Sequence, residues 1–429
     1  MTGSWVPVPE GSDFPLENLP YGVADDGHVV VAIGDHALDL AALDALGALD
    51  DDAPDVPGQV WTSGSLNAFM GLGPDAWAST RHRIVRVLTG APVPGALRPQ
   101  DGLRLRLPFE VADYVDFYAS EHHAANMARI LRPSSPSLPP AWRHLPIGYH
   151  GRSASIIVSG EAIPRPCGLI PGDDGVPRRT PTRRLDVEVE VGFVVGVGNA
   201  RGTTITTEAA REHVFGAVLV NDWSARDVQA FEYVPLGPFL GKSFATSISP
   251  WVVPLAALAP YWVVGPVQDP EPDPYLAGPE PRSLDLRLEL ALNGHVVSRT
   301  NARELYWSMH QQLAHCTVNG APSRTGDLFA SGTVSGPGPG SFGSLMELAW
   351  GGQRPLTLPD GTTRTFLADG DTATISGWCG GGSRPRVGFG SVTGTVVPPT
   401  TGYERSSPPE TGVEVRSYPV VPPDQTGGE

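Results

Sequence analysis

A row of acidic side chains alternates with apolar ones at residues 185–191, which read LDVEVEV. Because successive side chains of a β-strand point to opposite faces, the alternation predicts a strand with Asp186, Glu188 and Glu190 on one face. A solvated sheet face would explain this pattern. However, the apolar run that follows, FVVGV, indicates that the strand enters the interior, where uncompensated charge is costly. A hard divalent cation such as Mg²⁺ or Ca²⁺ would resolve that conflict.

A second group of polar side chains follows a predicted strand that ends at Asp222, where a further carboxylate oxygen could reach a metal. Ser224 is expected to cap a helix after this strand, and the Pro and Gly residues between 235 and 237 are expected to end it. These polar residues form either a solvated helix face or a binding face. The spacing i, i+3, i+7 places three of them on one face: Arg226, Gln229 and Tyr233.

Lys242 is unusual because it is the only lysine among the 30 basic residues of the chain. Lysine carries a compact ammonium group that can release a proton in a buried site, whereas arginine stays charged. Chance survival is one explanation of this single lysine. The other is that the chemistry of the site needs a lysine at this position.

A third group pairs an extended segment with a predicted helix. Asp116 and Tyr118 are two apart and share one face of the segment, and Ser120 is expected to cap the helix. His122 and His123 cannot both point inward, and the pattern does not decide which of them would act as a base. Together the three groups supply carboxylates for all-oxygen metal ligation, which favours Mg²⁺ or Ca²⁺ over Zn²⁺.

The formal charge of −16 argues against a nucleic-acid partner, since phosphate backbones are held by surplus Lys and Arg. An anionic substrate would need local cations, for which Arg132, Arg226 and Lys242 are candidates. No apolar run approaches the roughly 18 residues of a membrane span, and the amino terminus shows no targeting signal. We therefore expect a cytoplasmic protein. Three cysteines, odd in number and far apart, predict neither a disulfide framework nor a thiolate metal site.

Short apolar runs separated by Gly and Pro predict a mainly β chain with some helix. We expect three parts: residues 1–112 as a small β-rich domain, 113–397 as the catalytic domain and 398–429 as a disordered tail. In the first part, residues 28–34 and 81–88 are expected to form strands.

Several motifs make the chain resemble the fumarylacetoacetase family. The resemblance extends over residues 4–397, and its most specific block runs from NDWSARD to GKSF. It implies an SH3-like amino-terminal barrel, a β-sandwich roll as the catalytic domain and a homodimer. The motifs are SWVPVPEGSDFPLENLPYGV, DYVDFY, LPIGYHGR, LDVEVEVGF, NDWSARDVQAFEYVPLGPFLGKSFATSISPWVVP, GDLFASGTVSGP and FGSLMELAW.

The resemblance also implies roles for individual residues. The implied catalytic residues are His123 with its carboxylate partner Glu347, and Arg226, Gln229 and Lys242. The implied metal-site residues are Asp116, Glu188, Glu190, Asp222, Lys242 and Thr246. The implied substrate contacts are Tyr118, Arg132, Tyr149, Gln229, Tyr233 and Thr333.

The implied reaction is metal-dependent hydrolysis of a carbon-carbon bond in a dianionic β-diketone, 4-fumarylacetoacetate, at the end of tyrosine and phenylalanine catabolism. His123, oriented by Glu347, would take a proton from water, and Lys242 would supply one to the leaving enolate. Two alternatives stay open: an acylpyruvate hydrolase or related keto-acid hydrolase or decarboxylase of the same superfamily, and a non-catalytic metal-binding scaffold.

Overall fold

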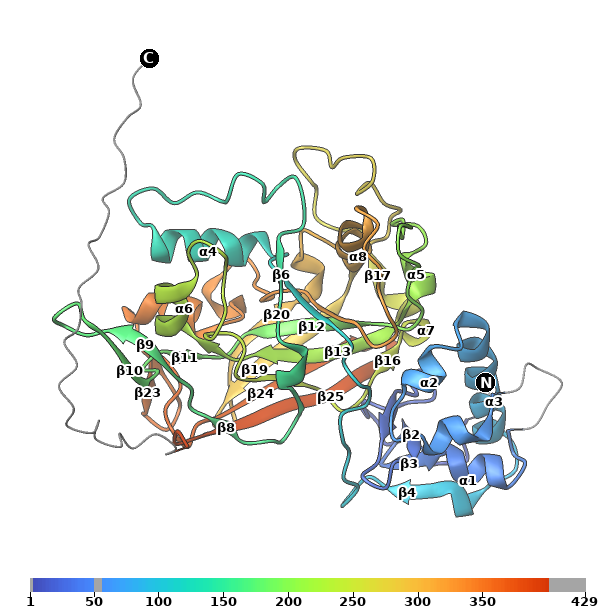
Figure 1. Cartoon of the computed structure of the whole chain (residues 1–429). Coiled ribbons are helices and arrows are strands. Elements are labelled where there is room, and N and C mark those ends of the chain that lie inside the picture. The colour runs from blue at the N-terminus through green and yellow to red at the C-terminus, as the bar shows by residue number, and fades with distance from the viewer. Residues whose placement is uncertain (1–2, 50–55, 401–429) are drawn as a thin grey trace, which may run out of the picture.

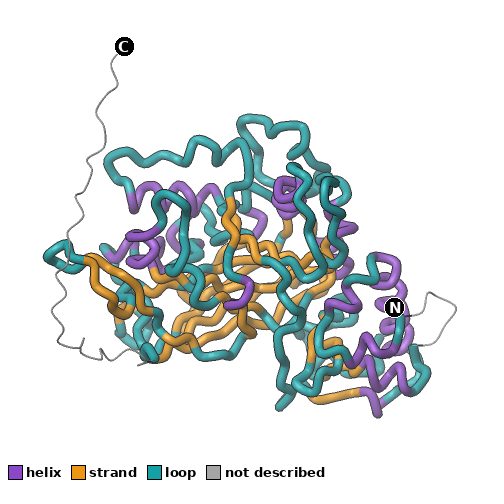
Figure 2. Tube along the Cα trace, viewed as in Figure 1, coloured by secondary structure: helices purple, strands orange, loops and turns teal. Residues whose placement is uncertain are grey.

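The computed structural model describes residues 3–49 and 56–400. It shows a small amino-terminal unit beside a larger, strand-rich body (Figure 1). Figure 2 shows strands through the centre of the larger body and helices toward its periphery. The tail predicted from residue 398 lies, from residue 401 onward, outside the described residues.

The small unit is a four-stranded antiparallel sheet in the order β1-β2-β3-β4, with helices against it. Its strand β2 is a run of five buried apolar residues, so the strand predicted at 28–34 is confirmed. Helix α1 follows β3 directly, and the Asp39 side chain caps it by accepting a hydrogen bond from the Ala42 amide. The bounds are β1 Tyr21–Val23, β2 Val29–Ile33, β3 His36–Asp39, β4 Leu97–Pro99, α1 Leu40–Ala45, α2 Asn67–Met70 and α3 Pro74–Thr89.

The prediction of a strand at residues 81–88 is wrong, because this segment lies inside α3. Pro74 occupies the first turn of the helix, a position where its missing amide proton costs nothing. Ile84, Val87 and Leu88 are buried at the spacing i, i+3, i+4. The apolar residues of this segment therefore form one face of an amphipathic helix.

The larger body is built around an eight-stranded mixed sheet in the order β6-β5-β21-β12-β13-β15-β7, with β16 also paired to β13. The parallel pairs are β5 with β21 and β7 with β15. Strands β12 and β13 are buried throughout, as expected of their apolar runs. The bounds are β5 Tyr114–Phe117, β6 Gly148–His150, β7 Ile156–Val158, β12 Val189–Val195, β13 Val214–Asp222, β15 Thr246–Ile248, β16 Val253–Pro254 and β21 Leu328–Ala330.

A five-stranded sheet in the order β20-β19-β24-β25-β8 packs against the first, with β13 in contact with β24 and β25. Its bounds are β8 Ile163–Pro164, β19 Leu286–Leu292, β20 His295–Asn301, β24 Thr372–Gly381 and β25 Arg384–Val397. The two-stranded pairs are β9 Cys167–Pro171 with β10 Pro177–Pro181, β11 Leu185–Asp186 with β14 Ser224–Ala225, β17 Trp262–Val263 with β18 Ser283–Leu284, and β22 Leu356–Thr357 with β23 Thr363–Arg364. The helices are α4 Glu121–Leu131, α5 Ala210–His213, α6 Arg226–Glu232, α7 Leu255–Leu258, α8 Met309–Thr317 and α9 Leu345–Leu348.

The two units share one apolar cluster. Phe215 of β13 packs against Tyr21 and Phe69 of the small unit, with ring centroids 5.5 and 5.7 Å apart. The coarse prediction of a strand-rich chain that begins with a small, strand-containing unit is confirmed, and the structure shows that the sheet of this unit is antiparallel. The domain boundary at residues 112 and 113, the SH3-like barrel and the β-sandwich roll stay predictions.

Two predicted absences can be compared with the described part of the chain. Within residues 3–49 and 56–400, no helix is long and apolar enough to cross a membrane. The three cysteines, all within those ranges, are free thiols.

Candidate active site

Helices α4 and α6 lie over one end of the larger body (Figure 1). Residues of both helices and of the eight-stranded sheet line a cavity of about 380 Å³. Its walls come from segments that are far apart in the sequence, and its rim carries the apolar side chains of Met127, Leu131 and Leu236. Among the described residues, the predicted site residues that line it are Asp116, Tyr118, His123, Tyr149, Glu188, Glu190, Arg226, Gln229, Tyr233, Lys242 and Thr333.

His123 lies in the first turn of α4 and points into this cavity. The predicted cap is confirmed, because the Ser120 side chain accepts a hydrogen bond from the His123 amide at 3.2 Å. His123 is buried, and its Nδ1 lies 2.7 Å from Glu347 Oε2. His122 faces the other way, with its Nε2 3.7 Å from Glu304 on the surface. Of the two candidate histidines, His123 is thus the one that faces the cavity.

Glu347 is fixed by three further hydrogen bonds. Asn126 Nδ2 donates to its Oε1 at 2.9 Å, and the Ser335 and Ser344 hydroxyls donate to its Oε2 at 2.9 Å. Burial alone would raise the pKa of Glu347, but His123 and these hydrogen bonds lower it. An ionised Glu347 accepts the Nδ1 proton of a neutral His123, which leaves His123 Nε2 as a proton acceptor facing the cavity.

Glu188 is neutralised by two buried cations. Arg226 Nη2 donates to its Oε1 at 2.7 Å, and Lys242 Nζ donates to its Oε2. The hydroxyls of Ser224 and Thr333 also donate to it, at 2.8 and 2.7 Å. Burial would raise the pKa of Glu188, but Arg226 and Lys242 outweigh burial and hold it well below its usual range. Glu188 is therefore a carboxylate with a complete set of partners.

Asp186 connects two parts of the site. Its Oδ2 accepts a hydrogen bond from Arg226 Nε at 2.8 Å, and its two oxygens accept from the amides of Leu345 and Met346 at 2.8 and 3.1 Å. These amides begin α9, the helix that carries Glu347. One buried carboxylate thus positions both Arg226 and the segment that orients His123.

Two local predictions around this carboxylate are wrong. The strand predicted through residues 185–191 is interrupted, because Asp186 ends β11 and β12 begins only at Val189. Ser224 does not cap α6. It lies in β14, paired with Asp186, and its hydroxyl donates a hydrogen bond to Glu188. Pairing between distant segments overrides the local strand and capping signals at both places.

Asp116, Glu190 and Asp222 form a buried acidic triad. One oxygen from each lies within 4.8 Å of the others. Asp222 has partners, since Lys242 Nζ donates to its Oδ2 at 2.6 Å and Thr246 Oγ1 to its Oδ1 at 3.0 Å. Asp116 Oδ1 and Glu190 Oε2 are buried and have no hydrogen-bond partner among the described residues.

The acidic triad fits a divalent cation. Burial first, and then repulsion by the neighbouring carboxylates, raise the pKa values of Asp116 and Glu190 well above their usual range. Buried carboxylate oxygens without a hydrogen-bond partner are the ligands that hard cations such as Mg²⁺ and Ca²⁺ prefer. The triad is therefore a candidate divalent-metal site.

The remaining predicted residues differ in how close they come to these groups. Tyr118 stands edge-on to His123, with ring centroids 5.4 Å apart. Tyr149 Oη lies 3.3 Å from Asp222 Oδ2. Tyr233 is half-exposed at the mouth of the cavity. Arg132 is exposed at the end of α4 and is not among the described residues that line the cavity; its guanidinium donates to the Ser137 carbonyl at 2.9 Å.

Sequence reasoning assigned no role to Asp186, Asn126 or the serines that hold Glu347. A signal existed for Asn126, because it lies three residues after His123 and thus on the same helix face. Asp186 was recognised as part of the acidic row, but its partners at residues 345 and 346 are not visible in the local pattern.

Two family models match the chain. The model for the fumarylacetoacetase N-terminal region covers residues 17–114, and that for the fumarylacetoacetate hydrolase C-terminal region covers residues 113–397. The fumarylacetoacetases of Bos taurus and Homo sapiens are each 46% identical over 420 residues, covering 92% of this chain and 99% of theirs. That of Arabidopsis thaliana is 45% identical over 423 residues, covering 92% of this chain and 98% of its own.

Solved structures share the fold at lower identity. A fumarylacetoacetate hydrolase from Exiguobacterium antarcticum superposes with a TM-score of 0.52 at 18% identity, covering 89% of this chain and 99% of that chain. A putative HpcE protein from Mycobacterium smegmatis gives 0.52 at 20% identity, with the same coverage. This likeness supports a catalytic unit whose sheet curls into a half-barrel. By its family models and its close relatives, the chain belongs to the fumarylacetoacetase family.

Proposed function

We propose that this chain hydrolyses 4-fumarylacetoacetate to fumarate and acetoacetate, the closing step of tyrosine and phenylalanine catabolism. The observation that carries this proposal is the buried pair of His123 and Glu347, 2.7 Å apart, in a cavity with two buried cations. A relative named fumarylacetoacetase with 46% identity over 92% of the chain supports the substrate.

His123 acts as the general base. Its Nε2 takes a proton from a water molecule, and the ionised Glu347 stabilises the imidazolium that forms. The resulting hydroxide attacks the carbonyl carbon beside the fumaryl group. The bond between this carbon and the acetoacetyl carbon then breaks, and its electron pair leaves with acetoacetate as an enolate.

Arg226, Gln229 and Lys242 stabilise the negative charge that develops on oxygen. Donors placed in this way contribute roughly 3 to 4 kcal/mol each in comparable oxyanion holes. Burial would lower the pKa of Lys242, but Asp222 and Glu188 raise it, so the ammonium is protonated at neutral pH. The raised pKa makes this ammonium a weak acid, so Lys242 gives its proton only to a strong base such as the leaving enolate, which an arginine cannot do.

Asp116, Glu190 and Asp222 would hold the divalent cation, which we propose to be Mg²⁺ or Ca²⁺ because every donor is an oxygen. A bound cation supplies positive charge that polarises the diketone oxygens. In this proposal Glu188, Thr246 and Lys242 border the metal site: Thr246 and Lys242 donate to Asp222, and Glu188 is linked to it through Lys242.

The remaining assignments extend the proposal to substrate binding and organisation. The chain is proposed to work as a cytoplasmic homodimer with an SH3-like barrel at residues 1–112 and a β-sandwich roll at residues 113–397. The dianionic substrate is proposed to contact Tyr118, Arg132, Tyr149, Gln229, Tyr233 and Thr333.

The test follows the loss of ultraviolet absorbance of fumarylacetoacetate after addition of purified protein with Mg²⁺ or Ca²⁺. We expect rapid loss with the parent chain and a reduction of roughly 100- to 10,000-fold for His123→Asn. His122→Asn is the matched control, because it changes the neighbouring histidine that faces the surface.

Each other outcome identifies an alternative. Turnover of an acylpyruvate but not of fumarylacetoacetate would replace the substrate. Turnover of neither by a folded, metal-loaded protein would favour a metal-binding scaffold. Equal losses in His122→Asn and His123→Asn would remove the assignment of the base.

A further inference from the structure

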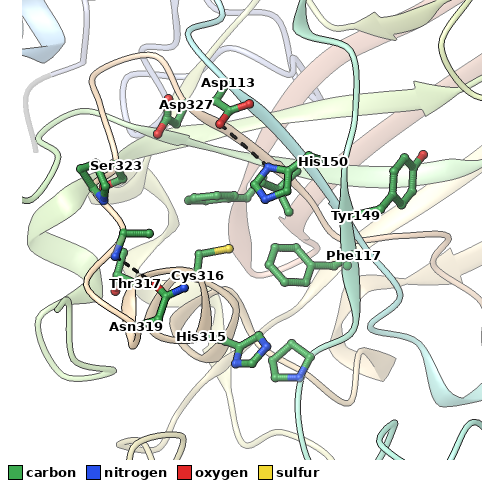
Figure 3. Close-up of a pocket in the computed structure, with 16 residues that line it drawn as sticks. Asp113, Phe117, Tyr149, His150, His315, Cys316, Thr317, Asn319, Ser323 and Asp327 are labelled. Atoms are coloured by element: carbon green, nitrogen blue, oxygen red, sulfur yellow. Dashed lines mark hydrogen bonds and ion pairs between the residues drawn. The ribbon is translucent and has the colours of Figure 1, made fainter. Parts of the chain in front are cut away.

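A second cavity, of about 280 Å³, lies on the other side of strands β5 and β6 and is called the rear cavity here (Figure 3). Along β5, Val115 and Phe117 line it, while Asp116 between them belongs to the acidic triad. Along β6, Tyr149 and His150 both contribute to the lining; the Tyr149 ring lies on the other side of the strand from His150, which lies beside Asp113. The carboxyl-terminal end of α8 and the loop after it close the other side.

The charges that line the rear cavity differ from those of the catalytic cavity. Asp113 and Asp327 line it, and the described residues that line it include no Arg or Lys. Arg324, which is not a lining residue, brings its guanidinium to 3.9 Å from Asp327 Oδ1. Val115, Phe117 and Phe329 form an apolar wall on one side, and the rest of the lining includes the polar residues His150, His315, Thr317, Asn319 and Ser323. A ligand of this cavity would therefore meet two carboxylates, one apolar wall and several polar side chains.

Asp327 is distinguished from the other residues of the rear cavity by a buried carboxylate oxygen without a hydrogen-bond partner among the described residues. It is 5% exposed, and its Oδ1 has no hydrogen-bond partner among the described residues. Its Oδ2 accepts a hydrogen bond from the Arg324 amide at 2.8 Å. The largely exposed guanidinium of Arg324 comes no nearer to Oδ1 than 3.9 Å, which is too long for a hydrogen bond.

We propose that the rear cavity binds a small organic cation, namely an ammonium group on a short apolar body. The ammonium would donate to the free Oδ1 of Asp327, with Asp113 adding negative charge nearby, and the apolar body would lie against Phe117 and Phe329. Leaving one buried carboxylate oxygen without a hydrogen-bond donor is costly, so such a ligand satisfies a need already present at Asp327 Oδ1.

Other ligand classes fit the rear cavity less well. An anion would face two carboxylates in a chain of net charge −16. A chelated metal ion needs several ligands close together. Among the described residues, the group of three or more His, Cys, Asp or Glu whose ligand atoms all lie within 4.8 Å of one another is the acidic triad, which is not part of this cavity. This proposal does not depend on the proposed hydrolase function.

The test is a calorimetric titration of the Mg²⁺-loaded protein with benzylammonium chloride. We expect one site per chain. Asp327→Asn is expected to weaken binding at least about tenfold, since a hydrogen bond to a charged group is lost. Cys316→Met, which fills the cavity at a sulfur that projects into it in Figure 3, is expected to weaken binding as well. Thermal unfolding of both variants checks that they fold.

Three controls decide the interpretation. Benzyl alcohol lacks the charge and ammonium chloride lacks the apolar body, so both are expected to bind at least about tenfold more weakly. Asp116→Asn alters the acidic triad and is expected to leave benzylammonium binding unchanged. The proposal is overturned if folded Asp327→Asn binds as tightly as the parent, if benzyl alcohol binds equally well, or if only Asp116→Asn abolishes binding.

Discussion

Glu188 and Glu190 are two residues apart in one acidic row, yet their surroundings are opposite. Glu188 lies between Arg226 and Lys242 and accepts two hydroxyl hydrogen bonds besides. Glu190 shares its space with Asp116 and Asp222, and one of its oxygens has no partner among the described residues. Accordingly, the pKa of Glu188 is lowered and that of Glu190 is raised.

The row of carboxylates therefore has two halves with different roles. The half around Glu188, called the balanced half, is neutral because its own cations offset its carboxylates, so it can hold these cations rigidly where an oxyanion develops. The half around Glu190 carries excess negative charge that only a bound cation or protons can balance. Asp222 joins the halves, because it contacts Lys242 and belongs to the triad.

Of the substitutions considered, Lys242→Met should cause the largest loss of stability, because it removes a cation from the balanced half. Removing one partner leaves Glu188 and Asp222 without their shared cation, and such changes cost about 3 to 5 kcal/mol in buried ion pairs. Urea unfolding measures this loss in free energy. Lys242→Arg is the matched control: it keeps the charge, and we expect it to retain fold and metal but lose turnover.

A Lys242→Met protein as stable as its parent would contradict this account of the balanced half. So would a Lys242→Arg protein with full turnover, because it would remove the need for a lysine at this position.

Asp186→Asn should make the balanced half less rigid, although its cations are still present. Arg226 loses a charged acceptor, and the start of α9 loses a charged partner for its amides, so both Arg226 and Glu347 shift. We expect kcat/KM to fall about 10- to 100-fold, with a stability loss of about 1 to 3 kcal/mol.

The matched control for Asp186→Asn is Asp174→Asn, an exposed aspartate paired with Arg178 on a surface hairpin. Measuring kcat/KM at a temperature where the variant is fully folded distinguishes positioning from simple instability, because a displaced Glu347 no longer orients His123. A folded Asp186→Asn protein with unchanged kcat/KM would contradict the linking role of Asp186.

Glu190→Gln should change the stability of the metal-free protein in the opposite direction from the substitutions around Glu188. Replacing one of three crowded carboxylates relieves repulsion, so the metal-free protein should gain roughly 1 kcal/mol at neutral pH. The same change should weaken Mg²⁺ or Ca²⁺ binding. Urea unfolding with and without a chelator measures both, and a loss of stability in the metal-free variant would argue against excess charge in the triad.

The stability of the metal-free protein should also depend on pH in opposite ways around Glu190 and around Glu188, with a smaller effect than the substitutions. The folded-state pKa values of Asp116 and Glu190 are raised, so the folded chain binds more protons than the unfolded chain above about pH 4. Stability from the triad should therefore fall as the pH rises through that window. Glu188, with its lowered pKa, contributes stability that is lost only as the pH falls below about 4.

Unfolding midpoints measured in chelator between about pH 5 and about pH 8 test this slope. The metal-loaded protein should lack it, because the cation holds the triad ionised. A midpoint that rises with pH in the metal-free protein, or the same slope with and without metal, would go against the prediction.

Signals within a few residues indicate several of the side chains that the structure brings together around the cavity. The alternation at 185–191 indicated the acidic row, the Ser120 cap placed His123 in the first turn of α4, and the single lysine marked Lys242. These signals are local, because they depend on strand and helix periodicity and on composition.

The parts that could not be predicted depend on contacts between distant segments. The interruption between β11 and β12 follows from pairing with residues 224 and 225, and the role of Asp186 from amides at 345 and 346. The helix at 74–89 was mistaken in part for a strand because a short apolar run fits both periods. The division of the acidic row into a balanced and an unbalanced half was likewise invisible without the fold.

The most direct test of that division is a calorimetric titration of the metal-free chain with Mg²⁺ and with Ca²⁺, repeated in buffers of different ionisation enthalpy. The account predicts one ion per chain, release of protons from the acidic triad on binding, and affinity at least about tenfold weaker in Asp116→Asn. Binding without proton release, or with equal affinity in Asp116→Asn, would contradict it.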